Sequence, residues 1–504
     1  MSAPMNILFI MADQWRGDCL SSGGHPCVQT PNLDQLAADG VMFKQHFAQA
    51  TPCGPSRASI YTGKYLHNHR SVINGMPLDT SHTNVALEAR KVGYDPVLFG
   101  YTDVFTDPQQ RVKDDPTRPS FDGVLPGMTQ AIPGETSKLP NSNALPWFAD
   151  LEAKGYSVPE ELLGVFKPRE AGGKGGLTAA PAQYSVDDSF TAFLTDEVIK
   201  YLSAREDQAW FVHLSFLAPH PPFIAPDPYH SMYDSTDVPR PVRAATVEDE
   251  AAQHPYLDFF LHNQRGWGIR YDHKSRNNLK LDDQDVLQAR ATYYGMMSEV
   301  DFHIGRLIAY LKEAGSYDNT LVVFTSDHGE QLGDHWQFSK FGYFDQSFHV
   351  PLIVRTPETG GKCVRGRRVD EFTESVDVMP TILDCLGISI PRQCDGKSLM
   401  LFCRGETPTN WRDEAHWEFD FRNFDDKDGN IALGLEADQC AVNVIRGRRY
   451  KYVHFKALPP LFFDLEKDPN EFENLAQHPE YQGLVLEYVQ KMLSWLMRPP
   501  LLDN

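Results

Sequence analysis

Long apolar runs are missing from this chain of 504 residues. No stretch reaches the roughly 18 consecutive apolar residues that a membrane-spanning helix needs, so we expect no membrane partner. The apolar run Asn6–Ala12 is too short for the core of a secretory signal peptide, and no Lys or Arg precedes it. The run instead predicts a buried strand.

Basic residues are also in deficit. The chain has 47 Lys and Arg against 68 Asp and Glu, which gives a formal net charge of −21. Such a surface repels phosphate backbones and anionic lipids, so a nucleic-acid partner is not expected either. For an anionic substrate, positive charge would have to be concentrated locally, as a metal ion and a few cationic side chains.

Cysteine is sparse, and the eight cysteines form neither a CxxC motif nor a dense framework. This spacing predicts reduced thiols in a cytoplasmic protein rather than a disulfide-stabilised secreted one. Hydrophobic residues make up 41% of the chain and charged residues 23%, the balance of an ordinary globular protein, which excludes disorder over most of its length.

Short apolar runs alternate with helical patterns along the chain. The runs are Asn6–Ala12, Pro96–Phe99, Trp210–Leu217 and Leu321–Phe324, and the helical patterns are Asn32–Asp39, Asn84–Lys91, Ser189–Ala204 and Asp285–Gly315. This order predicts an α/β fold with a mostly parallel sheet sandwiched by helices. We expect a catalytic domain over residues 1–398, in which 104–186 form a loop-rich lid or excursion, and a smaller α+β domain over 399–504.

Polar residues follow these runs where the strands are expected to end. They are Asp13, His220, Asp327 and His328. In open α/β sheets the working groups lie beyond the carboxyl ends of the strands. Two carboxylates with one imidazole favour Mn²⁺, Ca²⁺ or Mg²⁺ over a structural zinc ion, although Asp-His-Gly alone would also suit a tight turn.

A second motif is the segment 53–57, which reads CGPSR. Ser56 is expected to cap a helix that continues through Tyr61, which would place Cys53 just ahead of the helix N-terminus. Backbone N–H groups attract anions there, and Arg57 adds a permanent cation. A buried thiol beside a helix cap is the alternative interpretation.

This segment, with Thr62-Gly63 after it, resembles the signature at which sulfatases convert cysteine to formylglycine. Further matching positions are Asp13, Ala218–Phe223, Ser326–Glu330, Lys340, Tyr450–Phe455 and Asp464–Pro469. The chain thus resembles, over nearly its whole length, the sulfatase family of the alkaline phosphatase superfamily, and within it the phosphonate monoester hydrolases and related arylsulfatases. Gln14 and His328 match that branch, whereas Asp103 stands where the branch tends to have threonine.

The resemblance implies an alkaline-phosphatase-like fold and a formylglycine- and metal-dependent hydrolase of small anionic esters. Arylsulfatase-type hydrolysis of sulfate monoesters is the expected activity, overlapping with phosphonate monoesters and phosphodiesters. The alternatives are a primary phosphonate monoester hydrolase or phosphodiesterase and, more remotely, a non-catalytic binding protein. Formylglycine-generating machinery is the implied partner, and a homo-oligomer, dimer or tetramer, is expected.

The resemblance also assigns roles to individual residues. One divalent cation, Mn²⁺ or Ca²⁺, would be held by Asp13, Asp327, His328 and the formylglycine derived from Cys53. Catalytic roles fall to Cys53, Arg57, His220 and Lys340, and substrate contacts to Asn74, Tyr101 and Asp103. His220 is expected to be the general acid ahead of Lys340, because a histidine pKa in the neutral range lets it return as a base. A turn at Asn74, a solvated Lys340 and a purely structural His220 are the competing interpretations.

Overall fold

The computed structural model describes residues 5–106, 124–133, 146–159, 162–169, 179–205, 208–263, 281–357, 363–422 and 432–497. Eight strands in these ranges form the main sheet, in the order β5-β4-β6-β1-β7-β8-β2-β9. Their bounds are β1 Asn6–Ala12, β2 Val41–Phe47, β4 Pro96–Gly100, β5 Thr129–Pro133, β6 Phe211–Phe216, β7 Thr320–Thr325, β8 Leu352–Arg355 and β9 Arg367–Glu374. Only β8 pairs antiparallel, with β7 and β2, so the predicted mostly parallel sheet is confirmed.

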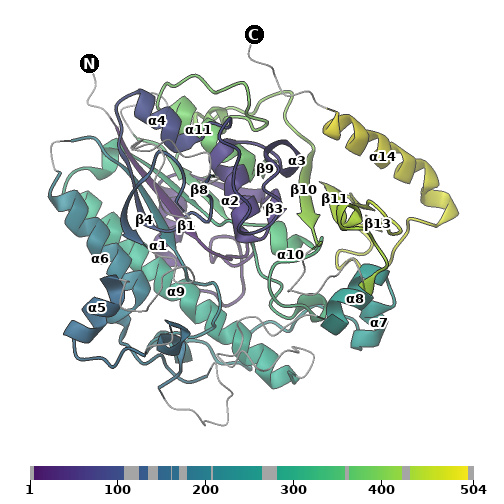
Figure 1. Cartoon of the computed structure of the whole chain (residues 1–504), viewed down its shortest axis with the longest axis horizontal. Helices are drawn as coiled ribbons and strands as arrows, with labels where there is room; N and C mark the ends of the chain where they lie inside the picture. Colours follow the sequence, from purple (N-terminus) through teal and green to yellow (C-terminus); the bar gives the residue numbers. More distant parts are fainter. Residues whose placement is uncertain are drawn as a thin grey trace.

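Helices cover both faces of this sheet (Figure 1). Those in the described ranges are α1 Pro31–Ala38, α2 Cys53–Thr62, α3 Leu66–His69, α4 Val85–Lys91, α5 Pro146–Ala153, α6 Phe190–Ser203, α7 Val247–Ala251, α8 Pro255–Asn263, α9 Asp283–Glu313, α10 Asp345–Phe348, α11 Val378–Cys385, α12 Met400–Cys403 and α14 Gln482–Leu496. None of them is long and apolar enough to cross a membrane.

The central strand β1 shows why the apolar runs are continuous. Leu8 and Ile10 share one core cluster with residues of α1, α6 and α9, whereas Phe9 and Met11 share another with residues of α2, α4 and α11. Successive side chains of a strand point to opposite faces, so a strand covered by helices on both faces is apolar at every position.

A second sheet has the order β13-β12-β11-β10-β3. Its strands are β3 Ala50–Thr51, β10 Glu414–Asp420, β11 Ala441–Gly447, β12 Tyr450–Phe455 and β13 Leu461–Asp464. Helix α14 packs on it through Tyr488 and Met492, on the right of Figure 1. Because β3, which directly precedes α2, pairs with β10, this sheet includes residues from the first part of the chain. The boundary at 398/399 stays a prediction.

The range 104–186, which was predicted to be rich in loops, also contains a strand and a helix. Strand β5 pairs in parallel with β4 at the edge of the main sheet, and α5 contributes Trp147 and Phe148 to the core. Residues 107–123, 134–145, 160–161 and 170–178 lie outside the described residues, so the lid also stays a prediction.

Candidate active site

Two neighbouring parallel strands and one helix N-terminus meet at the candidate site. Asp13 follows β1, and Asp327 lies just beyond the end of β7. Helix α2 begins at Cys53, and its N-cap is Pro52 in an extended conformation. The predicted cap at Ser56 is therefore wrong: its hydroxyl lies inside the first turn and donates to the Asp327 carbonyl oxygen, which ties α2 to the loop after β7.

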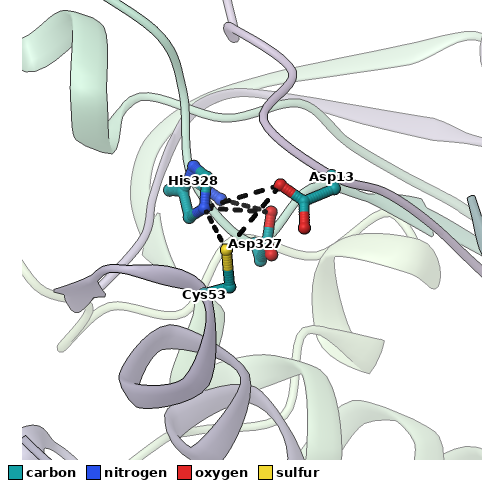
Figure 2. Close-up of side chains that lie close together, drawn as sticks. All are labelled: Asp13, Cys53, Asp327 and His328. Carbon is teal, nitrogen blue, oxygen red and sulfur yellow. Dashed lines mark hydrogen bonds and ion pairs between the residues drawn. The ribbon is translucent and has the colours of Figure 1, made fainter. Parts of the chain in front are cut away.

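Four buried side chains converge there (Figure 2). Potential ligand atoms of Asp13, Cys53, Asp327 and His328 all lie within 4.8 Å of one another. Cys53 Sγ is 3.2 Å from His328 Nε2 and 3.9 Å from Asp13 Oδ1. His328 Nε2 also lies 3.6 Å from Asp13 Oδ1 and 3.7 Å from Asp327 Oδ1.

The chemistry of this group fits a divalent cation. His328 Nδ1 lies 3.0 Å from the Gly329 carbonyl oxygen, which can only accept, so Nδ1 carries the proton and Nε2 is left as a donor of electrons to a metal. Burial alone would raise the pKa of Asp327, but His328, Arg57 and Lys340 outweigh burial and lower it. Oxygen donors with one imidazole suit Mn²⁺ or Ca²⁺.

Arg57 holds the two carboxylates in place. The side chain is fully buried, Nε donates to Asp327 Oδ2 at 2.7 Å, and Nη2 donates to Asp13 Oδ2 at 3.0 Å. Nη1 donates to the Tyr101 carbonyl and to Ser215 Oγ, both at 2.9 Å. Each of its three nitrogens thus has a partner within the protein, so the visible role of Arg57 is to orient the two carboxylates. Its expected catalytic role stays a prediction.

Tyr101 belongs to the same arrangement. Its hydroxyl donates to Asp13, and its ring centroid lies 4.2 Å from Arg57 Cζ. The side chain is 5% exposed, so its visible role is to fix Asp13.

Lys340 contacts the cluster directly and is also linked to Gln14 and Glu330, to which the sequence analysis gave no role in the site. Its Nζ lies 3.1 Å from Cys53 Sγ and 2.9 Å from Gln14 Oε1. Gln14 Nε2 donates in turn to the carboxylate of Glu330. Burial raises the pKa of Glu330 to about 7. Glu330 belongs to the same motif, Ser326–Glu330, as the proposed ligands Asp327 and His328. Its place in this motif could have indicated a role in the site.

His220 is close enough to the site for the charge of Lys340 to act on it. Its Nδ1 lies 2.7 Å from the Pro221 carbonyl oxygen, so Nδ1 carries the proton of the neutral ring. Burial, with Lys340 second, lowers the pKa of His220 to about 3. The neutral-range pKa that favoured His220 as the general acid is therefore not found.

Asn74 and Asp103 border the first turn of α2. Asn74 Oδ1 accepts from the Gly54 N–H at 2.8 Å, so the amide oxygen of this side chain has a partner within the protein. A Cβ on Gly54 would lie 3.0 Å from Asn74 Oδ1 and 3.2 Å from the Asp103 carbonyl oxygen, so a side chain there would require these neighbours to shift. Asp103 itself is half-buried and has a φ of 55°.

Comparisons with known proteins cover nearly the whole chain. The sulfatase family model matches residues 5–388, and a model of the C-terminal part of N-sulphoglucosamine sulphohydrolase matches residues 333–497. The multifunctional alkaline phosphatase superfamily protein PehA of Trinickia caryophylli is 42% identical, over 97% of this chain and 95% of its own length. An arylsulfatase of Clostridium perfringens is 31% identical, over 97% and 93%. The solved structure of a phosphonate monoester hydrolase of Agrobacterium radiobacter has a TM-score of 0.88 and 44% identity, over 97% of this chain and 95% of that one.

Proposed function

The chain belongs to the sulfatase family, and from this premise we propose that its buried cluster hydrolyses sulfate monoesters, phosphonate monoesters and phosphodiesters with one divalent cation and a nucleophile formed from Cys53. The expected family, the alkaline-phosphatase-like fold and the general class, a hydrolase of sulfate or phosphonate esters, are confirmed. The roles of single residues remain ours to propose.

One observation carries the proposal. Hard ligand atoms from Asp13, Asp327 and His328 surround Cys53 Sγ inside the protein, and Lys340 Nζ approaches the same sulfur at 3.1 Å. Cys53 Sγ marks the place of the oxygen that formylglycine would carry. A nucleophile between a cation site and a fixed ammonium group suits attack on a tetrahedral anion, because both positive charges oppose the negative charge that develops on its oxygens.

The contacts support a separate role for each group in the proposed reaction. When bound, a divalent cation would acidify the hydroxyl of the hydrated formylglycine and polarise the ester oxygens. Arg57 keeps Asp13 and Asp327 oriented towards the cation. We assign to Lys340, which lies beside Cys53 Sγ, the stabilisation of charge on the substrate. Proton transfer through Nε2 is the role left to His220, because its proton is on Nδ1.

Three further residues are proposed to form the wall of the substrate pocket. Asn74, Tyr101 and Asp103 surround the start of α2 and the ligand Asp13, and we assign the substrate's pocket wall to them. The conversion of Cys53 requires formylglycine-generating machinery as a partner. We also propose a homo-oligomer, a dimer or tetramer, which light scattering would test.

Phosphonate monoesters or phosphodiesters as the primary substrates are the second candidate. The name of the Agrobacterium radiobacter hydrolase favours it. The deciding measurement is kcat/KM for an aryl sulfate against a phenyl phosphonate ester. Asp103→Thr sharpens this comparison: removal of the carboxylate should change the ratio of the two values by up to about tenfold. An unchanged ratio would remove Asp103 from the substrate contacts.

The primary test is the mass of the peptide that contains Cys53, measured together with turnover. Conversion to formylglycine makes this peptide lighter than the cysteine form, and the converted fraction should rise in proportion to kcat per polypeptide. Full turnover by a preparation with only cysteine at position 53 would contradict the proposal. A converted protein that hydrolyses none of these esters would favour the non-catalytic binding protein.

A further inference from the structure

Two loops carry the proposed ligands and the ammonium group. The loop after β1 holds Asp13, and residues 327–340 after β7 hold His328 and Lys340. Residues 327–340 are called the catalytic loop below. Its hydrogen bonds lead away from the cluster around Cys53 to another buried carboxylate, Asp334, which is 2% exposed.

Asp334 joins three parts of the fold. Its Oδ2 accepts from Arg16 Nη1 at 2.7 Å, and its Oδ1 accepts from Arg290 Nη1 at 3.1 Å and from the Val242 N–H at 2.9 Å. Arg16 is 6% exposed and Arg290 is 4% exposed. Burial alone would raise the pKa of Asp334, but the two arginines outweigh burial and lower it. Without this carboxylate, two buried guanidinium groups would lose their shared counter-charge.

The catalytic loop needs such an anchor because its backbone is strained. Four of its non-glycine residues have left-handed φ angles: Leu332 at 54°, His335 at 50°, Trp336 at 56° and Ser339 at 75°. This conformation is unfavourable for a residue with a side chain and persists only where the surroundings impose it. Ser339, the last of the four, directly precedes Lys340, so the position of the ammonium group depends on this conformation.

Helix α9 supports both loops with one face. The Tyr293 hydroxyl donates to the Gln14 carbonyl at 2.6 Å and accepts from the Arg16 N–H at 3.1 Å. Arg290 Nη1 also donates to the Leu332 carbonyl at 2.8 Å. Residues three positions apart lie on the same side of a helix, so Arg290 and Tyr293 set the two loops against one rigid support.

We propose that Asp334 is a positioning residue for the reaction. Together with Arg16 and Arg290 it fixes the catalytic loop against the loop after β1, so that Lys340 and His328 meet Asp13 and Cys53 in the right geometry. The proposal rests on the proposed function for its catalytic consequence. The clamp itself can be measured without turnover.

Asp334→Asn is the test, and Asp18→Asn is its matched control. Asp18 also binds Arg16, at 2.9 and 2.7 Å, but its side chain is 51% exposed. Asp334→Asn should lower kcat by about 10–100-fold with little change in KM, because a displacement near 1 Å costs a rate of this order. The loss should be larger for an alkyl ester than for a nitrophenyl ester. Asp18→Asn should stay within about threefold of wild type for both.

Hydrogen exchange of peptides from residues 327–340 provides the second readout. Exchange there should be faster in Asp334→Asn than in Asp18→Asn. Asp334→Glu, which keeps the charge, should recover part of the rate and of the protection. If Asp334→Asn does not fold, Arg290→Lys tests the same clamp with the charge retained.

A wild-type kcat in Asp334→Asn would overturn the proposal. A reduced rate without faster exchange in these peptides would overturn it too, because Asp334 would then act by another route. If the wild-type protein hydrolyses no ester, the proposed function fails separately. The clamp is then supported by faster exchange and overturned by unchanged exchange.

Discussion

The cluster around Cys53 and a second cluster around Lys451 each contain two carboxylates, one lysine and one arginine, but they differ in how these charges are paired. Lys451, with 0% exposure, lies 2.9 Å from Asp345 Oδ1 and 2.8 Å from Glu471 Oε2. Arg446 Nε lies 3.0 Å from Asp345 Oδ2. Two carboxylates and two cations therefore balance within the cluster, and it can join α10 to the second sheet without a ligand.

Around Cys53 the charges are arranged differently. Arg57 binds the outer oxygens of Asp13 and Asp327, which leaves their Oδ1 atoms next to His328 Nε2. Lys340 contacts the Cys53 thiol and the neutral Gln14 amide. The difference teaches that a buried cluster whose ions are paired with each other stabilises the fold. A cluster whose donor atoms point towards a common centre has room for a cation and a reacting group.

The largest effect should follow from Cys53→Ala. Turnover of every ester should fall by at least about 10⁴-fold, since the nucleophile is lost, while the melting temperature stays close to wild type. Steady-state rates and thermal unfolding of the purified variant check this. Wild-type activity, with contaminating enzyme excluded, would end the assignment. Cys53→Ser is less decisive because a serine can still perform the first step.

Metal removal should come next. Exhaustive chelation should lower turnover by about 10³-fold or more, because a metal ion contributes several kcal/mol of charge stabilisation. Added Mn²⁺ or Ca²⁺ should restore the wild-type protein but not Asp13→Ala, which is expected to depress all substrates together. Metal analysis of the same samples provides the control. Full activity in a preparation shown to be metal-free would contradict the claim that the cluster around Cys53 works with a bound cation.

Lys451→Met should break the other cluster. Removing one partner of a buried ion pair destabilises a protein by about 3–5 kcal/mol, because the remaining charges are left uncompensated. The folded variant should nevertheless keep kcat within about threefold. Lys456→Met is the matched control, since its pair with Asp438 is exposed and should contribute less than about 1 kcal/mol. Denaturant unfolding measures both variants, and equal losses would show that the Lys451 cluster does not stabilise the fold as proposed.

The smallest effect concerns the leaving group and should distinguish the role of Lys340 from that of His220. Lys340→Ala should slow alkyl and phenyl esters by about 10²-fold more than nitrophenyl esters, since a good leaving group hardly needs assistance. His220→Ala should change this dependence less, because the neutral ring has no proton on Nε2 to donate. The slope of rate against leaving-group pKa is the measurement. If neither variant alters the slope, another residue or water assists the leaving group.

The sequence was a good guide to the sheet and to the residues that meet in the buried cluster. Asn6–Ala12 was predicted at its exact bounds, and the ends of α9 fall within two residues of the prediction. A strand buried on both faces is apolar throughout, and this signal is local. Strand β2 was missed because Lys44 and Gln45 interrupt its apolar residues.

Contacts between distant segments could not be predicted in the same way. Gln14 and Glu330 are 316 positions apart, and nothing near either residue indicates the pair. Arg57 was given a catalytic role from its place in a helix, but its bonds to Asp13 and Asp327 join segments that lie far apart in the sequence. The prediction that the pKa of His220 lies in the neutral range was wrong for a similar reason, because desolvation depends on what packs around the ring.

By itself, therefore, the sequence determined the order of strands and helices and the residue types at the strand ends, since these depend on neighbouring positions in the chain. Resemblance added the family and the proposed conversion of Cys53. Only the tertiary structure decided which carboxylates are held by Arg57, where Lys340 points and how Asp334 anchors the catalytic loop. Those outcomes depend on burial and on the meeting of segments far apart in sequence, and both exist only once the chain has folded.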